Sequence, residues 1–258
     1  MLLDEILDAK RQELEEAKTR LPLAQLQEHM KGRLAQRSFR RALHSARRLP
    51  ALIAELKRKS PSKGMLRERF DPVSLAQQLE AAGAAALSVL TDAPFFGGSL
   101  DFLRDVHEFT EIPTLRKDFV LDSYQVYEAA WYQADAVLLI VQILNDEELS
   151  RCLQTADLLG MDALVEVHTE DDLKRAVGAG ASVIGINHRN LRTFEMEPDI
   201  SNQLVPKIPA GKLIVAESGV QTPADIQRLR ALGVQAVLIG EALMTANDPA
   251  AKIRELFG

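Results

Sequence analysis

The sequence holds a single cysteine, Cys152, and this scarcity excludes an intramolecular disulfide framework. Cys152 lies among apolar residues at helical spacing, so we expect it to be a buried structural thiol. We also expect the protein to reside in a reducing compartment. Long apolar runs are missing too, since none approaches the roughly 18 residues that a membrane-spanning helix needs. The first residues, MLLDEILDAK, carry acids where a signal peptide carries bases. We therefore expect a cytoplasmic protein with no membrane partner.

Positive charge is also in short supply. The chain has 31 lysines and arginines against 37 aspartates and glutamates, which gives a net charge of −6. Binding nucleic acid over a broad surface requires a basic field, so no nucleic acid partner is expected. One local basic cluster is interpreted as a solvated helix face: Arg40, Arg41, Arg47 and Arg48.

Metal-ligand spacing such as HxxxH is absent among the histidines, and no metal site is expected. We expect surface or loop positions for all of them: His29, His44, His107, His168 and His188.

What the sequence does have is a regular alternation of short apolar runs with amphipathic, helix-like segments. The runs span 51–56, 85–90, 112–119, 135–141, 162–167, 182–187, 212–218 and 235–240. Eight such units predict a parallel sheet closed on itself. We therefore predict the α/β class and a (β/α)8 barrel forming one domain over 1–258, with residues 1–48 as an N-terminal helical extension. The alternative is an open doubly wound sheet, although no GxGxxG follows the first run.

Local signals agree with this division. Asp71-Pro72 and Thr222-Pro223 pair a capping side chain with a proline suited to the first helical turn. Glycines stand where helices should end before the next strand, at Gly83, Gly160, Gly180 and Gly233. In the extension, one apolar helical stripe consists of Leu3, Ile6, Leu7, Leu14 and Ala17.

Polar residues follow the predicted strands, and in a barrel of this kind the active site lies at the carboxyl ends of the strands. These residues are Glu55, Lys57, Lys117, Glu166, Asn187, Arg189, Glu217, Ser218, Gly240 and Glu241. Lysines and carboxylates on one rim favour proton transfer, and a lysine in a dry pocket is expected to have a lowered pKa. The glycine-containing ends of the last two strands predict a phosphate site. Phe96, after the second strand, fits either packing on a flat substrate ring or a core plug.

The motifs IAELKRKSPSKG, FFGGSLDFL, LRKDFVLDSYQVYEA, DAVLLI, ALVEVH, IGINHRNL, IVAESGV and VLIGEALM occur in the family order of indole-3-glycerol-phosphate synthase. Over nearly the whole chain, the sequence resembles this ring-closing enzyme of tryptophan biosynthesis. The resemblance implies a (β/α)8 barrel with an N-terminal helical segment, usually a monomer. It also implies a phosphorylated small-molecule substrate, 1-(2-carboxyphenylamino)-1-deoxyribulose 5-phosphate, which loses carbon dioxide and water without a cofactor.

The resemblance also implies roles. Lys117 is similar to the acid that protonates the ketone, Glu166 to the group that assists dehydration, and Lys57 either pairs the substrate carboxylate or donates a second proton. Glu55 and Glu217 are similar to carboxylates that orient the lysines. Polar contacts are implied for Asn187, Arg189 and Ser218, and a place in a mobile loop is implied for Ser60. Apolar walls are implied for Phe96, Phe119 and Leu138. Phosphate contacts are implied for Gly219, Gly240 and Glu241.

Two residues depart from the family pattern, and three other functions stay open. Glu241 stands where a serine is common, and its carboxylate should point away from the phosphate; His188 stands where a small polar residue is expected. Phosphoribosylanthranilate isomerase would need a cysteine or aspartate acid/base pair at the rim. A Schiff-base aldolase would use one of the lysines covalently. A catalytically silent barrel would only bind a phosphorylated ligand.

Overall fold

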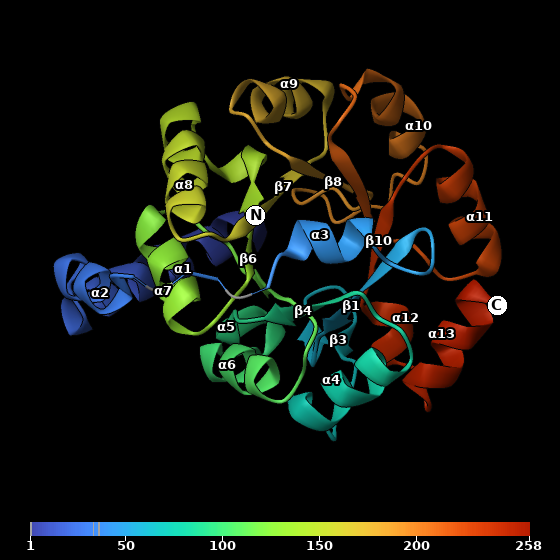
Figure 1. Ribbon diagram of the computed structural model, residues 1–258, viewed down its shortest axis with the longest axis horizontal. Coiled ribbons are helices and arrows are strands. Elements are labelled where there is room, and N and C mark those ends of the chain that lie inside the picture. Colours follow the sequence, from blue (N-terminus) through green and yellow to red (C-terminus); the bar gives the residue numbers. More distant parts are fainter. Residues whose placement is uncertain (1, 33, 36) are drawn as a thin grey trace.

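The computed structural model describes residues 2–32, 34–35 and 37–258 and shows a closed barrel of parallel strands (Figure 1). In the ring the strands follow the order β1-β10-β9-β8-β7-β6-β5-β4. They are β1 (Ala51–Leu56), β4 (Ala86–Leu90), β5 (Thr114–Lys117), β6 (Ala136–Ile140), β7 (Asp162–Val167), β8 (Val183–Asn187), β9 (Leu213–Glu217) and β10 (Ala236–Ile239). The predicted barrel is confirmed and the open sheet is excluded. Most strands start or end one or two residues inside the predicted runs.

Helices connect the strands on the outside of the barrel (Figure 1). They are α4 (Pro72–Ala81), α5 (Ala93–Phe96), α6 (Leu100–Glu108), α7 (Ser123–Trp131), α8 (Asp146–Leu158), α9 (Glu170–Gly178), α10 (Ile200–Leu204), α11 (Pro223–Ala231), α12 (Glu241–Met244) and α13 (Pro249–Phe257), with short 3-10 turns at Val141–Ile143 and Val205–Lys207. The loop after β1 forms a small antiparallel hairpin of β2 (Lys59–Ser60) and β3 (Gly64–Met65). None of the helices in the described ranges is both long and apolar enough to cross a bilayer.

The predicted helix boundaries are confirmed by their caps. The Asp71 side chain accepts a hydrogen bond from the Ser74 amide, and the Thr222 hydroxyl accepts one from the Asp225 amide. Gly83 has a φ of 96°, a left-handed conformation that glycine adopts at a helix end without a steric penalty. These local signals fix where each crossover turns back toward the barrel.

The inside of the barrel is filled by one face of each strand. Ile53, Leu115, Leu138, Leu164, Val215 and Leu238 are buried together there. Because strand side chains alternate, residues two positions beyond these inward-facing ones also point inward, toward the carboxyl end of the barrel. The fold therefore carries Glu55, two residues after Ile53, into the barrel mouth.

The N-terminal extension runs from one end of the barrel to the other. Its helices are α1 (Leu2–Arg20), α2 (Leu23–Met30) and α3 (Phe39–His44). Near the carboxyl end, Lys18 of α1 pairs with Asp122 at 2.9 Å. At the amino end, Ser38 donates a hydrogen bond to Asp162 at the start of β7. Phe39 of α3 is fully buried in the inner core, and α3 lies across the barrel opening in Figure 1. α3 therefore closes the floor of the barrel.

The predicted apolar stripe of α1 is largely buried, but it also contains a charge that sequence analysis missed. Lys10 is 1% exposed. Its Nζ lies 2.9 Å from Oδ1 of Asp118, 3.3 Å from Oδ2 of Asp92 and 2.7 Å from Oε2 of Glu13. Asp118 directly follows Lys117, so this ion cluster ties α1 to the carboxyl end of β5.

Two other expectations have opposite outcomes. Cys152 is fully buried and burial raises the pKa of its thiol to about 12, which confirms a structural thiol. The expectation that all histidines are surface or loop residues is wrong for His107, which is buried in α6. His168 and His188 lie in loops, as expected, but they are buried as well. Each has hydrogen-bonding partners distant in sequence, which sequence spacing does not reveal.

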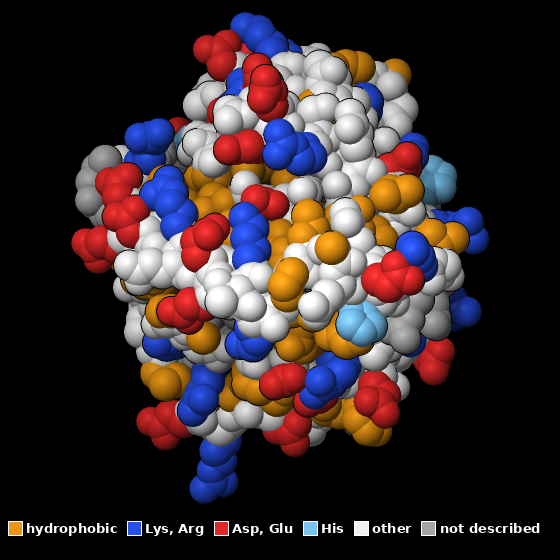
Figure 2. All heavy atoms as spheres, turned by 90° about the vertical axis from the view of Figure 1, so that its left-hand side faces the viewer, with side chains coloured by type: hydrophobic (Ala, Val, Ile, Leu, Met, Phe, Trp, Pro, Cys, Tyr) orange, Lys and Arg blue, Asp and Glu red, His pale blue; other side chains and the backbone are white. Residues whose placement is uncertain are grey.

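The surface agrees with the modest net charge. Figure 2 shows acidic and basic side chains interspersed on the side of the barrel that lies at the left of Figure 1.

Within the described ranges, no three or more histidine, cysteine, aspartate or glutamate side chains are grouped so that they could hold a metal ion.

Candidate active site

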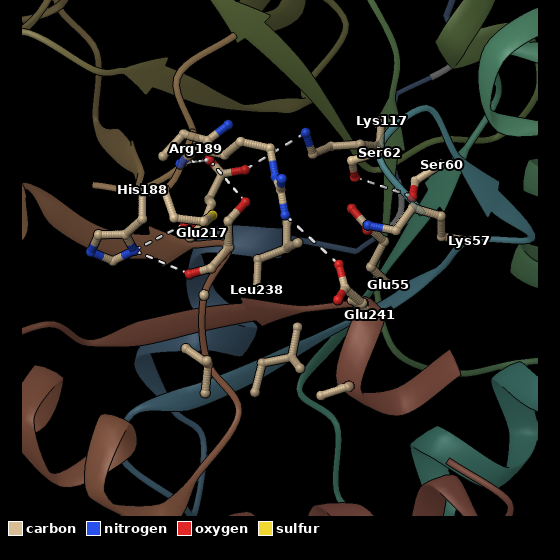
Figure 3. Close-up of a pocket in the computed structure, with 18 of the residues that line it drawn as sticks. Glu55, Lys57, Ser60, Ser62, Lys117, His188, Arg189, Glu217, Leu238 and Glu241 are labelled. Carbon is tan, nitrogen blue, oxygen red and sulfur yellow. Dashed lines mark hydrogen bonds and ion pairs between the residues drawn. The ribbon is translucent and has the colours of Figure 1, made fainter. Parts of the chain in front are cut away.

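A cavity of about 680 Å³ opens at the carboxyl ends of the strands. The structure brings all of the predicted site residues to its walls (Figure 3). They are Glu55, Lys57, Ser60, Phe96, Lys117, Phe119, Leu138, Glu166, Asn187, Arg189, Glu217, Ser218, Gly219, Gly240 and Glu241. Their mutual geometry limits what each can do.

Glu55 and Lys57 form an ion pair on the inward face of β1. Lys57 Nζ lies 2.6 Å from Glu55 Oε1, and Glu55 is 4% exposed. Burial opposes ionisation of Glu55, yet the charges of Lys57 and Lys117 hold its pKa below the ordinary value. Glu55 is therefore a fixed negative charge inside the barrel.

Gly240 provides the space for this carboxylate. A Cβ atom at Gly240 would lie 2.3 Å from Glu55 Oε1. The sequence-based assignment of Gly240 to the phosphate site therefore missed a second requirement, that β10 leaves room for Glu55.

Lys117 lies among carboxylates from three other strands. Its Nζ is 3.5 Å from Glu166 Oε2 and 3.7 Å from Glu217 Oε2. Burial by itself would lower the pKa of Lys117, but Glu166, Glu217 and Glu55 outweigh it and raise the pKa. The expected lowering was thus wrong for this lysine, and its surroundings favour the protonated form.

Glu217 has the opposite electrostatic character to Glu55. Burial and the negative charge of Glu166 raise the pKa of Glu217 well above its ordinary value. Neither carboxyl oxygen has a hydrogen-bond partner among the described residues. A protonated Glu217 is an unused donor that faces the cavity beside Lys117.

We predict a pH-dependent stability effect from Glu217. Because its folded pKa is raised, the folded protein binds more protons than the unfolded chain once the pH exceeds the unfolded value, and stability falls as the pH rises toward the folded pKa. Glu217→Gln removes this loss, so its free energy of unfolding should gain on the parent by about 1.4 kcal/mol per pH unit in that window. Denaturant unfolding from pH 4 to 8 measures the difference.

The exposed Glu16 of α1 supplies the matched control, since Glu16→Gln should leave the pH dependence unchanged. A constant difference between Glu217→Gln and the parent at every pH would mean that Glu217 ionises alike in the folded and unfolded states.

Gly185 on β8 makes room for Glu217 and was missed by sequence analysis. A Cβ at Gly185 would lie 2.1 Å from Glu217 Oε1. Gly185→Ala should displace the carboxyl group and lower kcat/KM about tenfold to a hundredfold, since small misplacements of reacting groups have effects of that size. Steady-state kinetics measures this.

Gly178→Ala is the control for Gly185→Ala, because a Cβ at Gly178 meets nothing within 4 Å. Equal activity of the two variants would show that Glu217 tolerates displacement.

A hydrogen-bonded chain links the ends of β7, β8 and β9. Ser218 Oγ donates to Asn187 Oδ1 at 2.9 Å, and Asn187 Nδ2 donates to Glu166 Oε1 at 3.0 Å. The Arg189 amide donates to the same Asn187 oxygen at 3.0 Å. These contacts fix the Asn187 amide and so fix the direction in which Glu166 points.

The apolar wall lies opposite this chain. The rings of Phe96 and Phe119 have centroids 6.1 Å apart and an interplanar angle of 40°, and Leu138 is buried beside them. Leu191 and Phe194 also line the cavity and were missed. The apolar residues of NLRTF after β8 were the available signal, but their loop has no periodicity that indicates a direction.

Glu241 lies among cations at the mouth of the cavity. Its carboxylate lies 3.7 Å from Arg189 Nη2 and 3.9 Å from Lys63 Nζ, and Glu241 lines the cavity (Figure 3). It is thus directed at the cations of the mouth rather than away from them. Lys63, in the loop with Ser60, was missed because SPSKG reads as a solvated turn.

Comparison with known proteins points to one family. The family model described as indole-3-glycerol phosphate synthase matches residues 3–256. A protein of that name from Polaromonas sp. strain JS666 is 47% identical over 100% of this chain and 98% of its own length. Another of that name, from Campylobacter jejuni subsp. doylei, is 44% identical over 99% of this chain and 100% of its own length.

Solved structures share the fold at low sequence identity. The 3-hexulose-6-phosphate synthase of Salmonella typhimurium matches with a TM-score of 0.65 and 14% identity, over 80% of this chain and 96% of that chain. The N-acetylmannosamine-6-phosphate 2-epimerase of Clostridium perfringens matches with a TM-score of 0.61 and 13% identity, over 78% and 89%. At such identities the likeness concerns the barrel alone.

Proposed function

The chain belongs to the indole-3-glycerol phosphate synthase family, and from that premise we propose how its residues close the indole ring. The enzyme is a carboxy-lyase of tryptophan biosynthesis that converts 1-(2-carboxyphenylamino)-1-deoxyribulose 5-phosphate into indole-3-glycerol phosphate, carbon dioxide and water. The observation that carries the proposal is the half-buried Lys117, whose pKa is raised by Glu55, Glu166 and Glu217 and which lies in the same cavity as an aromatic wall.

In the first step, the ring carbon that bears the carboxylate attacks the ketone carbon. Lys117 donates its proton to the ketone oxygen as the bond forms, and the surrounding carboxylates keep it charged until then. Phe96 and Phe119 hold the ring against the sugar chain, and such positioning contributes up to about 7–11 kcal/mol in favourable cases. Loss of carbon dioxide then restores the aromatic ring.

In the second step, the new hydroxyl leaves as water. Glu166, held by Asn187, assists this dehydration. Lys57 either pairs with the substrate carboxylate before it leaves or donates the second proton, and its contact with Glu55 supports both roles. Glu217 enters the cycle protonated and donates a hydrogen bond to a substrate oxygen near Lys117.

The phosphate binds at the ends of β9 and β10. Gly219 and Gly240 present main-chain amides with little obstruction, and Lys63 and Arg189 supply nearby positive charge. When the phosphate enters and binds these cations, the Glu241 carboxylate has to leave them and turn toward solvent.

The test is to mix the purified protein with the carboxyphenylamino-deoxyribulose phosphate and record indole fluorescence. Indole formation supports the proposal. Turnover of phosphoribosylanthranilate instead would favour the isomerase, and a protein trapped by borohydride with a phosphorylated sugar would favour the aldolase. Binding without turnover would leave a silent barrel.

Finer properties belong to the same proposal. We propose a monomer. Its residues 1–258 act as one domain with 1–48 as an integral extension, and the ion cluster of Lys10 supports this single domain. The single buried cysteine supports a cytoplasmic location.

A further inference from the structure

His188 lies behind the turn that follows β9. It is 2% exposed, and its ring points away from the centre of the cavity (Figure 3). Nδ1 lies 3.0 Å from the Glu217 carbonyl oxygen and 3.1 Å from the Ser218 carbonyl oxygen. Carbonyl oxygens only accept hydrogen bonds, so Nδ1 carries the proton and donates to both.

The other ring nitrogen fixes the orientation of the imidazole. Nε2 lies 2.8 Å from Oγ of Ser201, a fully buried residue of α10. In the neutral ring Nε2 is an acceptor, and the Ser201 hydroxyl donates to it. Burial lowers the pKa of His188, which favours this neutral form.

The turn that His188 contacts has an unfavourable backbone. Ser218 has a φ of 66° and Gly219 a φ of 80°. Glycine adopts this left-handed region readily, but serine does not, so the surroundings must hold Ser218 there. The two carbonyl groups that share the Nδ1 proton flank Ser218 on either side, and a donor that holds both restrains rotation about its backbone bonds.

We propose that His188 is a positioning residue that keeps Ser218 in its left-handed conformation. Through Ser218 it sets two parts of the site: the hydroxyl that donates to Asn187, and the backbone of Gly219, which lines the cavity. The second effect rests on the proposed phosphate site. His188 itself touches neither substrate nor reacting atoms.

The test is a double-mutant cycle with inorganic phosphate as the probe. His188→Leu removes the donor, and the Kd for phosphate should rise about tenfold, the size expected when one residue loses its support in the left-handed region. Ser218→Gly removes the need for that support, so adding His188→Leu to it should change the Kd less than about threefold. Titration calorimetry measures all four proteins.

His188→Asn keeps a donor at the same bond distance from Cβ and should restore phosphate binding and KM to within about threefold of the parent. Equal losses from His188→Leu in the parent and in Ser218→Gly would overturn the inference, because a general structural role moves both alike. So would a crystal structure of His188→Leu in which Ser218 keeps a φ near 66°. That structural result needs no ligand, and a parent protein that forms no indole would count against the proposed function only.

Discussion

Lys117→Met is expected to lower kcat/KM about 10³-fold or more, at the upper part of the range for loss of a general acid. The substitution removes the proton donated to the ketone oxygen, and it also removes the one positive charge that lies between Glu166 and Glu217. Without that charge the pKa of Glu55, which Lys57 and Lys117 hold below the ordinary value, should rise. Indole fluorescence under single-turnover conditions measures the loss at the chemical step.

Two further variants separate proton transfer from charge. Lys117→Arg keeps a positive charge but holds its proton far more tightly, and it should be impaired nearly as much as Lys117→Met. Lys63→Met removes a cation at the mouth of the same cavity, where the side chain is 59% exposed, and should cost less than about tenfold. If Lys117→Met kept activity within tenfold of the parent, the acid would have to be another residue, with Lys57 the next candidate.

Lys10→Met is expected to have the largest effect on stability. It leaves Asp118 and Asp92 buried next to an apolar side chain, and loss of one partner of a buried ion pair costs about 3–5 kcal/mol. For a chain of this length the melting temperature should fall by on the order of 10 °C. Denaturant unfolding at pH 7, followed by circular dichroism, gives the free energy directly.

The pH dependence of this effect has a definite sign. Although burial opposes ionisation of Asp118, Arg116 and Lys10 hold its pKa below the ordinary range. The stability from the ionised form is therefore present above the unfolded pKa, about 3.9, and is lost as the pH falls toward the folded pKa. The deficit of Lys10→Met should shrink over that range.

Lys18→Met is the control on the same helix. Lys18 pairs with Asp122 at 2.9 Å, but its side chain is 34% exposed, so its replacement should cost no more than about 1 kcal/mol. If both variants unfolded alike, the buried cluster would contribute no more than a surface pair.

The residues at the strand ends could be predicted from sequence because the alternation along a strand and the closure of the sheet lead to the same placement. Alternation along β1 predicts that Glu55 shares the face of Ile53, and the closed sheet brings such residues together at one end. The role of Gly185 could not be predicted, because it depends on a residue of the neighbouring strand. Glu217 fills the space that a side chain at Gly185 would occupy.

The burial of charged side chains and the direction of their pKa shifts could not be predicted from sequence. Lys10 occupies an apolar helical stripe, where a lysine interrupts the pattern, and its two aspartate partners lie more than eighty positions away. Lys117 was expected to lose its proton readily because burial alone has that effect. The sum of three carboxylates on different strands reverses the sign, and only the folded arrangement provides that sum.

The course of the N-terminal extension also constrains how the chain folds. Helices α1 and α3 leave the ribosome well before two of their partners in the barrel, because Lys18 reaches Asp122 across 104 positions and Ser38, the cap of α3, reaches Asp162 across 124. Asp122, the barrel partner of Lys18, is synthesised only after β1, β4 and β5, whereas α3 contacts β1, which follows it directly in the chain. Docking of α1 is therefore a long-range event that carries a loop-closure entropy cost. The extension joins parts of the barrel that are distant in the chain, and a barrel without it would have an open floor.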